Sequence, residues 1–197
     1  MNIGIDFDGV LFDTESAFRA MSQMYNLKLG GEIVDMEKLR FQERYNWTWE
    51  QCKQFMSDCM LDIHKKAQIM PCAKAVINAL CKHHNVYAIT SRGLAIDGEI
   101  EITNNRLQQE GIKFDQIIYN CSDKLQACKQ LNIDLMIDDW DTTIIKLADA
   151  DIKCFYYKDN VCNDYTHKNV VDVRDWGDIA VELVNIGLID IEDIEIM

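Results

Sequence analysis

The chain lacks long apolar runs and an obvious export signal. Its longest apolar runs, such as IDLMI before Asp138, are too short to span a bilayer. No basic region followed by an apolar stretch and a small-residue cleavage site opens the sequence, so we expect no secretory signal. Internal repeats, low-complexity segments and flexible linkers are also missing. We therefore expect a cytoplasmic protein with no membrane partner.

Clustered cysteines are missing as well. The chain has eight cysteines, but none of them form a CxxC pair. Cys52, Cys59, Cys72 and Cys81 lack the tight spacing that a zinc site requires. Without export, free thiols are the expected state and a disulfide scaffold is not expected.

Basic residues are few: 33 Asp and Glu face 20 Lys and Arg, for a net charge of −13. This balance argues against a nucleic-acid polymer as partner, because binding phosphate backbones requires basic surface. A small anionic substrate is compatible with it if a metal ion and a few basic residues concentrate positive charge locally. With 197 residues and 48% hydrophobic content, the chain suffices for one globular domain with a modest insertion.

From residue 71 onward the sequence alternates between strand and helix patterns. Met70-Pro71 precedes a predicted helix at 72–83, because proline suits the first helical position. Strands are predicted at 86–90, 114–119, 133–137, 152–156 and 170–173, and helices at 100–109, 122–131, 142–150 and 176–186. Together with a buried strand at 2–7, this alternation predicts an α/β fold with a doubly wound parallel sheet.

A helical insert is predicted after the first strand. Residues 14–27 form a predicted helix with Thr14 as N-cap, and helical periodicity covers 34–68 with almost no glycine. We therefore expect an α/β core made of residues 1–14 and 71–197, interrupted by a small helical domain at 15–70. Asp13 is expected to order the hinge or the start of the first helix.

Polar side chains gather at four predicted strand ends, where ligands bind in open α/β sheets. They are Asp6 and Asp8, then Thr90, Ser91 and Arg92, then Lys124, and finally Asp138 and Asp139. Asp6 and Asp8 are two residues apart, so in extended backbone both point to one side, and Gly9 then permits a tight turn. Lys124 lies in the first turn of a helix, which is unfavourable for a cation and favours a phosphate-binding role.

Each of these residue types has a task in phosphoryl transfer. A carboxylate can attack phosphorus and form an aspartyl-phosphate. Carboxylates from two strands suit Mg²⁺, which prefers oxygen ligands. A hydroxyl and a lysine can neutralise the non-bridging oxygens, and a second acid can protonate the leaving oxygen and later activate water.

The chain resembles the haloacid dehalogenase-like superfamily of phosphatases. The segment DFDGVLFDT is similar to its first motif, Thr90-Ser91 to its second, Lys124 to its third and Asp138-Asp139 to its fourth, in the family's order. The resemblance implies a Rossmann-like core with the helical insert as a cap over the site. It implies Asp6 as nucleophile, Asp8 as general acid/base, and Mg²⁺ held by Asp6, the Asp8 carbonyl and one or both of Asp138 and Asp139.

Within the superfamily, the helical cap, ITSR at 89–92 and IDDW at 137–140 resemble the 5′(3′)-deoxyribonucleotidase-like group. This implies a magnesium-dependent phosphatase of a small phosphorylated metabolite, with (deoxy)nucleoside monophosphates as candidate substrates. A sugar-phosphate phosphatase and a phosphomutase use the same residues and stay open. A phosphorylated receiver domain is disfavoured, because its acid pair precedes the phosphorylated Asp and it has no such insert.

Several assignments stay open at this stage. Arg92 binds the substrate phosphate or lies on the surface, and Asp138 or Asp139 could cap the following helix. The insert aromatics Phe41, Tyr45, Trp47 and Trp49 could stack on a base, but such residues more often form a domain's own core. The four histidines, His64, His83, His84 and His167, show no ligand spacing and are expected to be surface or structural. Oligomeric state is not predicted.

Overall fold

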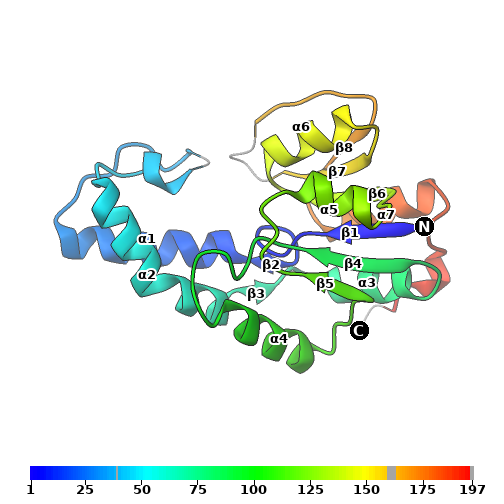
Figure 1. Ribbon diagram of the computed structural model, residues 1–197, viewed down its shortest axis with the longest axis horizontal. Helices are drawn as coiled ribbons and strands as arrows, with labels where there is room; N and C mark the ends of the chain where they lie inside the picture. Colours follow the sequence, from blue (N-terminus) through cyan, green and yellow to red (C-terminus); the bar gives the residue numbers. More distant parts are fainter. Residues whose placement is uncertain (39, 159–162, 196–197) are drawn as a thin grey trace.

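The computed structural model describes residues 1–38, 40–158 and 163–195, and its centre is a six-stranded parallel sheet (Figure 1). The strand order is β5-β4-β1-β6-β7-β8. The strands are β1 (Asn2–Ile5), β4 (Asn85–Ile89), β5 (Gln116–Ile118), β6 (Leu135–Asp138), β7 (Lys153–Tyr157) and β8 (Val170–Val173). The chain starts in the middle, adds β4 and β5 on one side, and then returns to add β6, β7 and β8 on the other. The carboxyl ends of β1 and β6 therefore form the topological switch point.

Helices cover both faces of the sheet. They are α3 (Ala73–Cys81), α4 (Glu99–Glu110), α5 (Lys124–Gln130), α6 (Asp141–Asp149) and α7 (Trp176–Asn185), with a final short 3-10 helix η2 (Ile191–Asp193). One apolar cluster joins the strands to α3, α4 and α7, and a second joins them to α5 and α6. The doubly wound α/β fold predicted from the sequence is confirmed.

Side chains alternate between these two faces along each central strand, as extended backbone requires. Val86 and Ala88 of β4 belong to the first cluster, whereas Ile89 belongs to the second. On β6, Ile137 and Met136 divide in the same way. The strands are apolar on both sides, which is typical of a parallel sheet covered by helices.

A helical insert leaves and rejoins the core through two short strands. β2 (Phe12–Asp13) and β3 (Gln68–Ile69) pair antiparallel, with Phe12 opposite Ile69. Between them lie α1 (Thr14–Leu29), a 3-10 turn η1 (Phe41–Glu43) and α2 (Trp49–Lys66). Helices α1 and α2 run side by side away from the sheet and enclose an apolar cluster of their own (Figure 1).

The prediction of continuous helical structure over residues 34–68 is wrong in its first half. Residues 32–38 and 40–46 contain no α-helix; around the turn η1, Val34 N–H donates to the Arg44 carbonyl and Asn46 N–H to the Glu32 carbonyl. The buried Arg44 side chain donates from Nε to the Lys38 carbonyl over 2.7 Å. Helix α2 begins only after Thr48, whose side chain and that of Gln51 form a capping box. That Thr-x-x-Gln signal is present in the sequence.

Smaller differences concern the residues that begin helices. The N-cap of α1 is Asp13, whose Oδ1 accepts from Ser16 N–H, and Thr14 is the first helical residue. This confirms that Asp13 orders the helix start. The predicted helix at 72–83 begins at Ala73, because Cys72 adopts a left-handed conformation with φ 67°. The helix predicted at 122–131 begins at Lys124, with Asp123 as its N-cap.

The described residues include no helix with the length and apolar character needed to span a membrane.

Replacing Thr48 by alanine removes the hydroxyl that accepts from Gln51 N–H at the start of α2. We expect Thr48→Ala to lower the free energy of unfolding by about 1 kcal/mol, measured by urea denaturation. Thr48→Ser keeps the oxygen and serves as the control, with an expected change of a few tenths of that value. Equal losses in both variants would show that the capping hydroxyl contributes nothing.

Candidate active site

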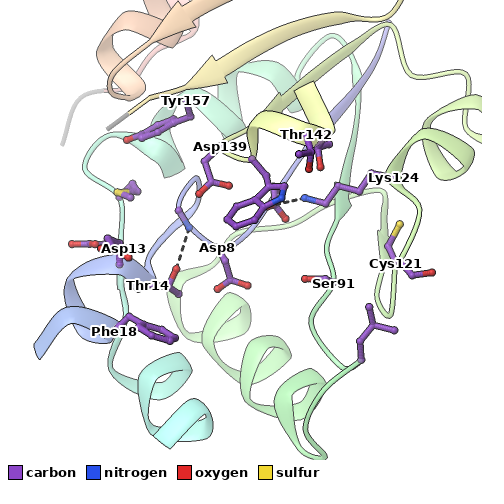
Figure 2. A pocket seen from close by; sticks show the side chains of 18 of the residues that line it. Asp8, Asp13, Thr14, Phe18, Ser91, Cys121, Lys124, Asp139, Thr142 and Tyr157 are labelled. Carbon is purple, nitrogen blue, oxygen red and sulfur yellow. Dashed lines mark hydrogen bonds and ion pairs between the residues drawn. The ribbon is translucent and has the colours of Figure 1, made fainter. Parts of the chain in front are cut away.

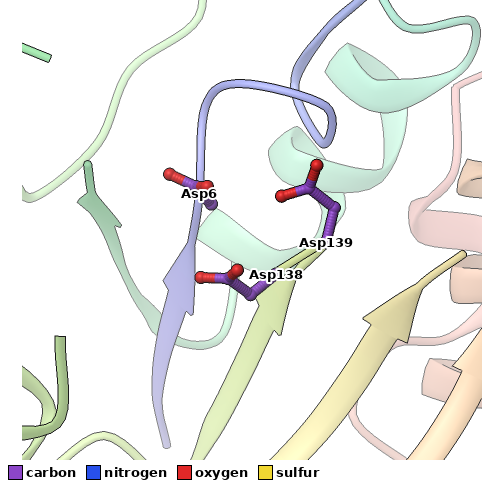
Figure 3. A group of neighbouring side chains, drawn as sticks. All are labelled: Asp6, Asp138 and Asp139. Carbon is purple, nitrogen blue, oxygen red and sulfur yellow. The ribbon is translucent and has the colours of Figure 1, made fainter. Parts of the chain in front are cut away.

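Three carboxylates meet at the switch point of the sheet (Figure 3). Asp6 follows β1, Asp138 ends β6 and Asp139 comes directly after it. Each offers an oxygen within 4.8 Å of the others, and Asp138 is fully buried. The structure thus brings Asp6 together with Asp138 and Asp139, as predicted. The two strand ends are aligned by a hydrogen bond from Asp6 N–H to the Ile137 carbonyl.

Lys124 is the cation of this cluster. From the first residue of α5 its Nζ lies 2.8 Å from Asp6 Oδ2 and 2.6 Å from Asp138 Oδ2 (Figure 2). Burial alone lowers the pKa of Lys124, but Asp138 and Asp6 outweigh burial and raise that pKa, so the lysine stays charged. The prediction that Lys124 reaches the site of Asp6 agrees with these contacts.

The cluster carries more negative charge than Lys124 can neutralise. Three carboxylates and one lysine sum to −2 when all are ionised. Burial, with Asp138 and Asp8 nearby, raises the pKa of Asp6 to about 7 despite Lys124. Burial and the charges of Asp138 and Asp6 likewise raise the pKa of Asp139 well above its ordinary value. The three carboxylates offer oxygen ligands, and the cluster has an excess of negative charge. It therefore fits a divalent cation such as Mg²⁺, held by Asp6, Asp138 and Asp139.

Neither member of the Asp138-Asp139 pair is the N-cap of α6. That position is Trp140, and its side chain makes no capping bond. Asp138 Oδ1 accepts from the Trp140 N–H over 2.9 Å, so Asp138 supports the turn into α6 while its other oxygen bonds Lys124.

Gly9 allows the loop after β1 to pass Asp139. Its φ is +76°, and a Cβ at this position would collide with the Asp139 carboxylate. The Gly9 N–H donates to Thr14 Oγ1 at the start of α1 over 3.1 Å (Figure 2). Glycine is therefore required here both for its conformation and for its lack of a side chain.

The two hydroxyl residues after β4 differ in position. Thr90 is fully buried, and its Oγ1 accepts from Arg92 N–H over 3.2 Å. Ser91 is exposed and lines the cavity in front of Lys124 (Figure 2). Of the two hydroxyls of the second motif, the structure therefore favours Ser91 over Thr90 as the one that meets a ligand.

Asp8 points to a different partner from Asp6. Its carboxylate accepts three hydrogen bonds from Arg92, of which the shortest joins Arg92 Nη2 and Asp8 Oδ1 over 2.7 Å. Burial alone raises the pKa of Asp8, but the adjacent Arg92 guanidinium outweighs burial and lowers that pKa below its ordinary value. Asp8 is also not among the carboxylates grouped around the candidate metal position.

Arg92 is a buried residue whose side chain bonds Asp8. Its side chain is 1% exposed, because the guanidinium lies over the ring of Phe12 at 4.3 Å and bonds Asp8. A phosphate group could reach this guanidinium only by displacing Asp8. The surface alternative stated for Arg92 is therefore wrong, whereas its phosphate-binding alternative stays a prediction. The ion pair with Asp8 joins residues 84 positions apart.

Sequence reasoning did not single out His64 and Glu99. His64 of α2 is buried, with Nε2 3.6 Å from Asp8 Oδ1 and Nδ1 3.6 Å from Glu99 Oε1. Burial lowers the pKa of His64 to about 4, so the imidazole is neutral at neutral pH. No sequence spacing could have revealed this contact, although His64 fits the structural role expected for it. His83 and Asp193 form an exposed pair at 2.9 Å, as expected for a surface histidine.

A cavity of about 1080 Å³ opens between the switch point and the insert (Figure 2). From the core it is lined by Asp6, Asp8, Ser91, Lys124, Asp139, Lys146, Tyr157 and Arg174, among others. The insert contributes Phe18 and Arg19 of α1 and Glu37 of the following loop. The cavity thus joins the carboxylate cluster to a polar chamber large enough for a small metabolite.

The four aromatic residues considered for substrate contact do not line this cavity. Phe41, Tyr45 and Trp47 are buried in the apolar cluster of the insert, and Tyr45 stacks on Trp47 at 4.5 Å. Trp49 is 61% exposed beside Lys53. The aromatic side chain that the insert does present to the cavity is Phe18 (Figure 2).

Comparison with known proteins agrees with this architecture. No family model matches the chain. A Bacillus subtilis protein named "Putative nucleotidase YqfW" is 24% identical over 187 residues, which is 94% of each chain. A haloacid dehalogenase-like family hydrolase of Streptococcus pneumoniae is 14% identical and superposes with a TM-score of 0.68, covering 92% of this chain and 97% of its own.

A β-phosphoglucomutase of Clostridium difficile is 17% identical, covers 95% of this chain and 96% of its own, and has a TM-score of 0.58. The chain therefore has the fold of the haloacid dehalogenase-like hydrolases.

Proposed function

We propose that this protein is a magnesium-dependent phosphatase of small phosphate monoesters. The observation that carries the proposal is the cluster of Asp6, Asp138, Asp139 and Lys124, with a fourth carboxylate, Asp8, in the same cavity. Its net charge of −2 matches a divalent cation, and its position at a strand end faces a chamber of metabolite size.

Asp6 is the proposed nucleophile. One carboxylate oxygen of Asp6 attacks phosphorus, the bond from phosphorus to the ester oxygen breaks, and Asp8 gives its proton to the leaving oxygen. Water then attacks the aspartyl-phosphate while Asp8 takes a proton from that water, and inorganic phosphate leaves with Asp6 restored. Lys124 and Ser91 neutralise and orient the non-bridging oxygens. A bound Mg²⁺ would supply further charge neutralisation for these oxygens.

The helical insert is the proposed cap of this site. Phe18, Arg19 and Glu37 line the cavity opposite the carboxylate cluster. They are therefore the insert residues best placed to contact the part of the substrate beyond its phosphate. Phe18 offers an aromatic surface suited to a base or to another flat group.

The substrate screen that tests the function starts from the Bacillus relative's name. Purified protein with Mg²⁺ is incubated with (deoxy)nucleoside 5′- and 3′-monophosphates and with sugar phosphates, and inorganic phosphate is measured. We expect phosphate release, with the nucleoside monophosphates preferred. An isomerised sugar phosphate without phosphate release would instead identify a phosphomutase. No turnover of any phosphate ester would contradict the proposal.

Asp6→Asn is expected to lower kcat for p-nitrophenyl phosphate on the order of 10³-fold or more, because the amide cannot attack phosphorus. The fold should persist, since the change removes one charge from three crowded carboxylates, of which Asp6 and Asp138 are buried. Circular dichroism checks the fold. Asp134→Asn, at the opposite end of β6, is the matched control and should keep its activity. Normal metal-dependent turnover by Asp6→Asn would exclude Asp6 as the nucleophile.

The raised pKa values predict a pH-dependent stabilisation by Mg²⁺. Between the ordinary value of 3.8 and about 7, native metal-free protein binds more protons at Asp6 than the unfolded chain does, so rising pH destabilises it. Mg²⁺ competes with these protons and binds best above pH 7. At a hundredfold excess over Kd it should add about 2.7 kcal/mol to the free energy of unfolding at pH 8.

Thermal unfolding with and without Mg²⁺ at pH 8 and pH 5.5 measures this effect. The increase in Tm should be large at pH 8 and small at pH 5.5. Asp139→Asn, which removes a candidate ligand, should reduce the increase at pH 8. An equal increase at both pH values would show that Mg²⁺ binds away from the cluster.

A further inference from the structure

We propose that Trp140 is a substrate-binding residue whose indole ring stacks on the base of a nucleoside monophosphate. The inference rests on the proposed phosphatase function and deepens it, because it names a residue that selects one class of ester. Trp140 is half-buried and lines the cavity that holds the carboxylate cluster. It comes directly after Asp139, and its backbone N–H donates to Asp138 Oδ1 over 2.9 Å. The start of its side chain is therefore fixed beside the proposed site of phosphoryl transfer.

Trp140 differs from the two tryptophans that stabilise the protein's own cores. Trp47 and Trp176 are buried in apolar clusters. Their indole N–H groups donate to Asn26 Oδ1 and to the Val10 carbonyl, each over 2.8 Å. Trp140 belongs to none of the three apolar clusters, and no described residue accepts a hydrogen bond from its indole N–H. An indole that borders a cavity without such partners fits contact with a ligand.

The position of Trp140 in the chain is a poor one for helix stability. Trp140 is the N-cap of α6, and its side chain makes no capping bond. Helices α1, α5 and α7 have Asp13, Asp123 and Asp175 as N-caps, and each of these carboxylates accepts a backbone N–H of its helix. The chain thus lacks a stabilising cap where an aromatic side chain borders the cavity, and such departures from local preference are expected at functional sites.

A second aromatic side chain borders the same cavity from the insert. Phe18 of α1 lines the cavity on the side opposite the carboxylate cluster (Figure 2). Its ring packs on Phe41 at 4.9 Å and on Phe55 at 5.2 Å, so the insert core holds it in place. Because Trp140 belongs to the core side, a base attached to the bound phosphate would have an aromatic wall on each side. Stacking on one aromatic side chain strengthens the binding of a base about tenfold or more.

The test compares kcat/KM of Trp140→Leu for thymidine 5′-monophosphate and for 2-deoxyribose 5-phosphate, which lacks the base. We expect a loss of about tenfold or more for the nucleotide, mainly through KM, and a much smaller loss for the sugar phosphate. Trp140→Phe keeps a ring, so its loss for the nucleotide should be smaller, and it covers the case in which Trp140→Leu does not fold. Trp49→Leu is the matched control, because Trp49 is 61% exposed and does not line the cavity, and it should change neither value.

Tryptophan fluorescence measures the same contact without turnover. In Asp6→Asn with Mg²⁺, thymidine 5′-monophosphate should quench part of the tryptophan emission, because a stacked base lies against the indole of Trp140. Adding Trp140→Phe to this variant should abolish the quenching, whereas adding Trp49→Phe should leave it in place.

Equal losses for both esters in Trp140→Leu, or quenching that survives Trp140→Phe, would overturn the stacking role of Trp140. Release of phosphate from sugar phosphates by a wild-type protein that neither hydrolyses nor binds the nucleotide would also overturn it. The phosphatase proposal would stand in each of these cases, since wild-type phosphate release tests it separately. If the wild-type protein hydrolyses no phosphate ester, the proposed function fails, and the quenching in Asp6→Asn still decides whether Trp140 binds a base.

Discussion

The repulsion among the carboxylates at the end of β1 and β6 is the constraint on which this molecule depends. Asp6, Asp138 and Asp139 are crowded into a space where one lysine cannot neutralise them. Buried charge without a partner is costly. The sheet tolerates the arrangement because Lys124 bridges two of the acids and because the backbone of β1 and β6 is locked by parallel pairing. The divalent cation of the proposed function would relieve this repulsion.

The ion pair of Asp8 with Arg92 lies beside the carboxylate cluster. Asp8 and Arg92 are paired within a shell formed by Phe12, Thr103 and His64. This shell draws on β2, α4 and α2, so the acid/base candidate is supported by both the core and the insert. Asp6, in contrast, is supported by the sheet and α5 alone. The two acids are near neighbours in the chain, yet different parts of the fold orient them.

The parts of this structure that the sequence predicts are those governed by local periodicity. Strands β1, β4 and β6 are apolar runs that end in polar residues, and topology alone brings Asp6, Lys124 and Asp138 together. The ion pair of Asp8 with Arg92 and the contact of His64 with Glu99 depend on side-chain directions set by distant packing, which no spacing encodes. In the loop around Arg44 the apolar residues recur at helix-like intervals, but Phe41 and Tyr45 are buried in the insert core whereas Ile33 and Val34 are exposed, so the spacing does not mark one buried helical face. The buried Arg44, which holds the loop, gives no periodic signal.

The pairing of β2 with β3 has a consequence for how such proteins can change. Asp13 and Gln68 are partners across two antiparallel strands, so the chain leaves and re-enters the core at one point. Everything between them could be exchanged for another segment with the same closely spaced ends, and the six-stranded sheet would keep its hydrogen bonds. The sheet edge that carries Asp6 and Asp139 and the insert that lines the opposite side of the cavity are thus separable parts of the fold. A different insert at this junction would change the lining of the cavity while the carboxylate cluster keeps its place in the sheet.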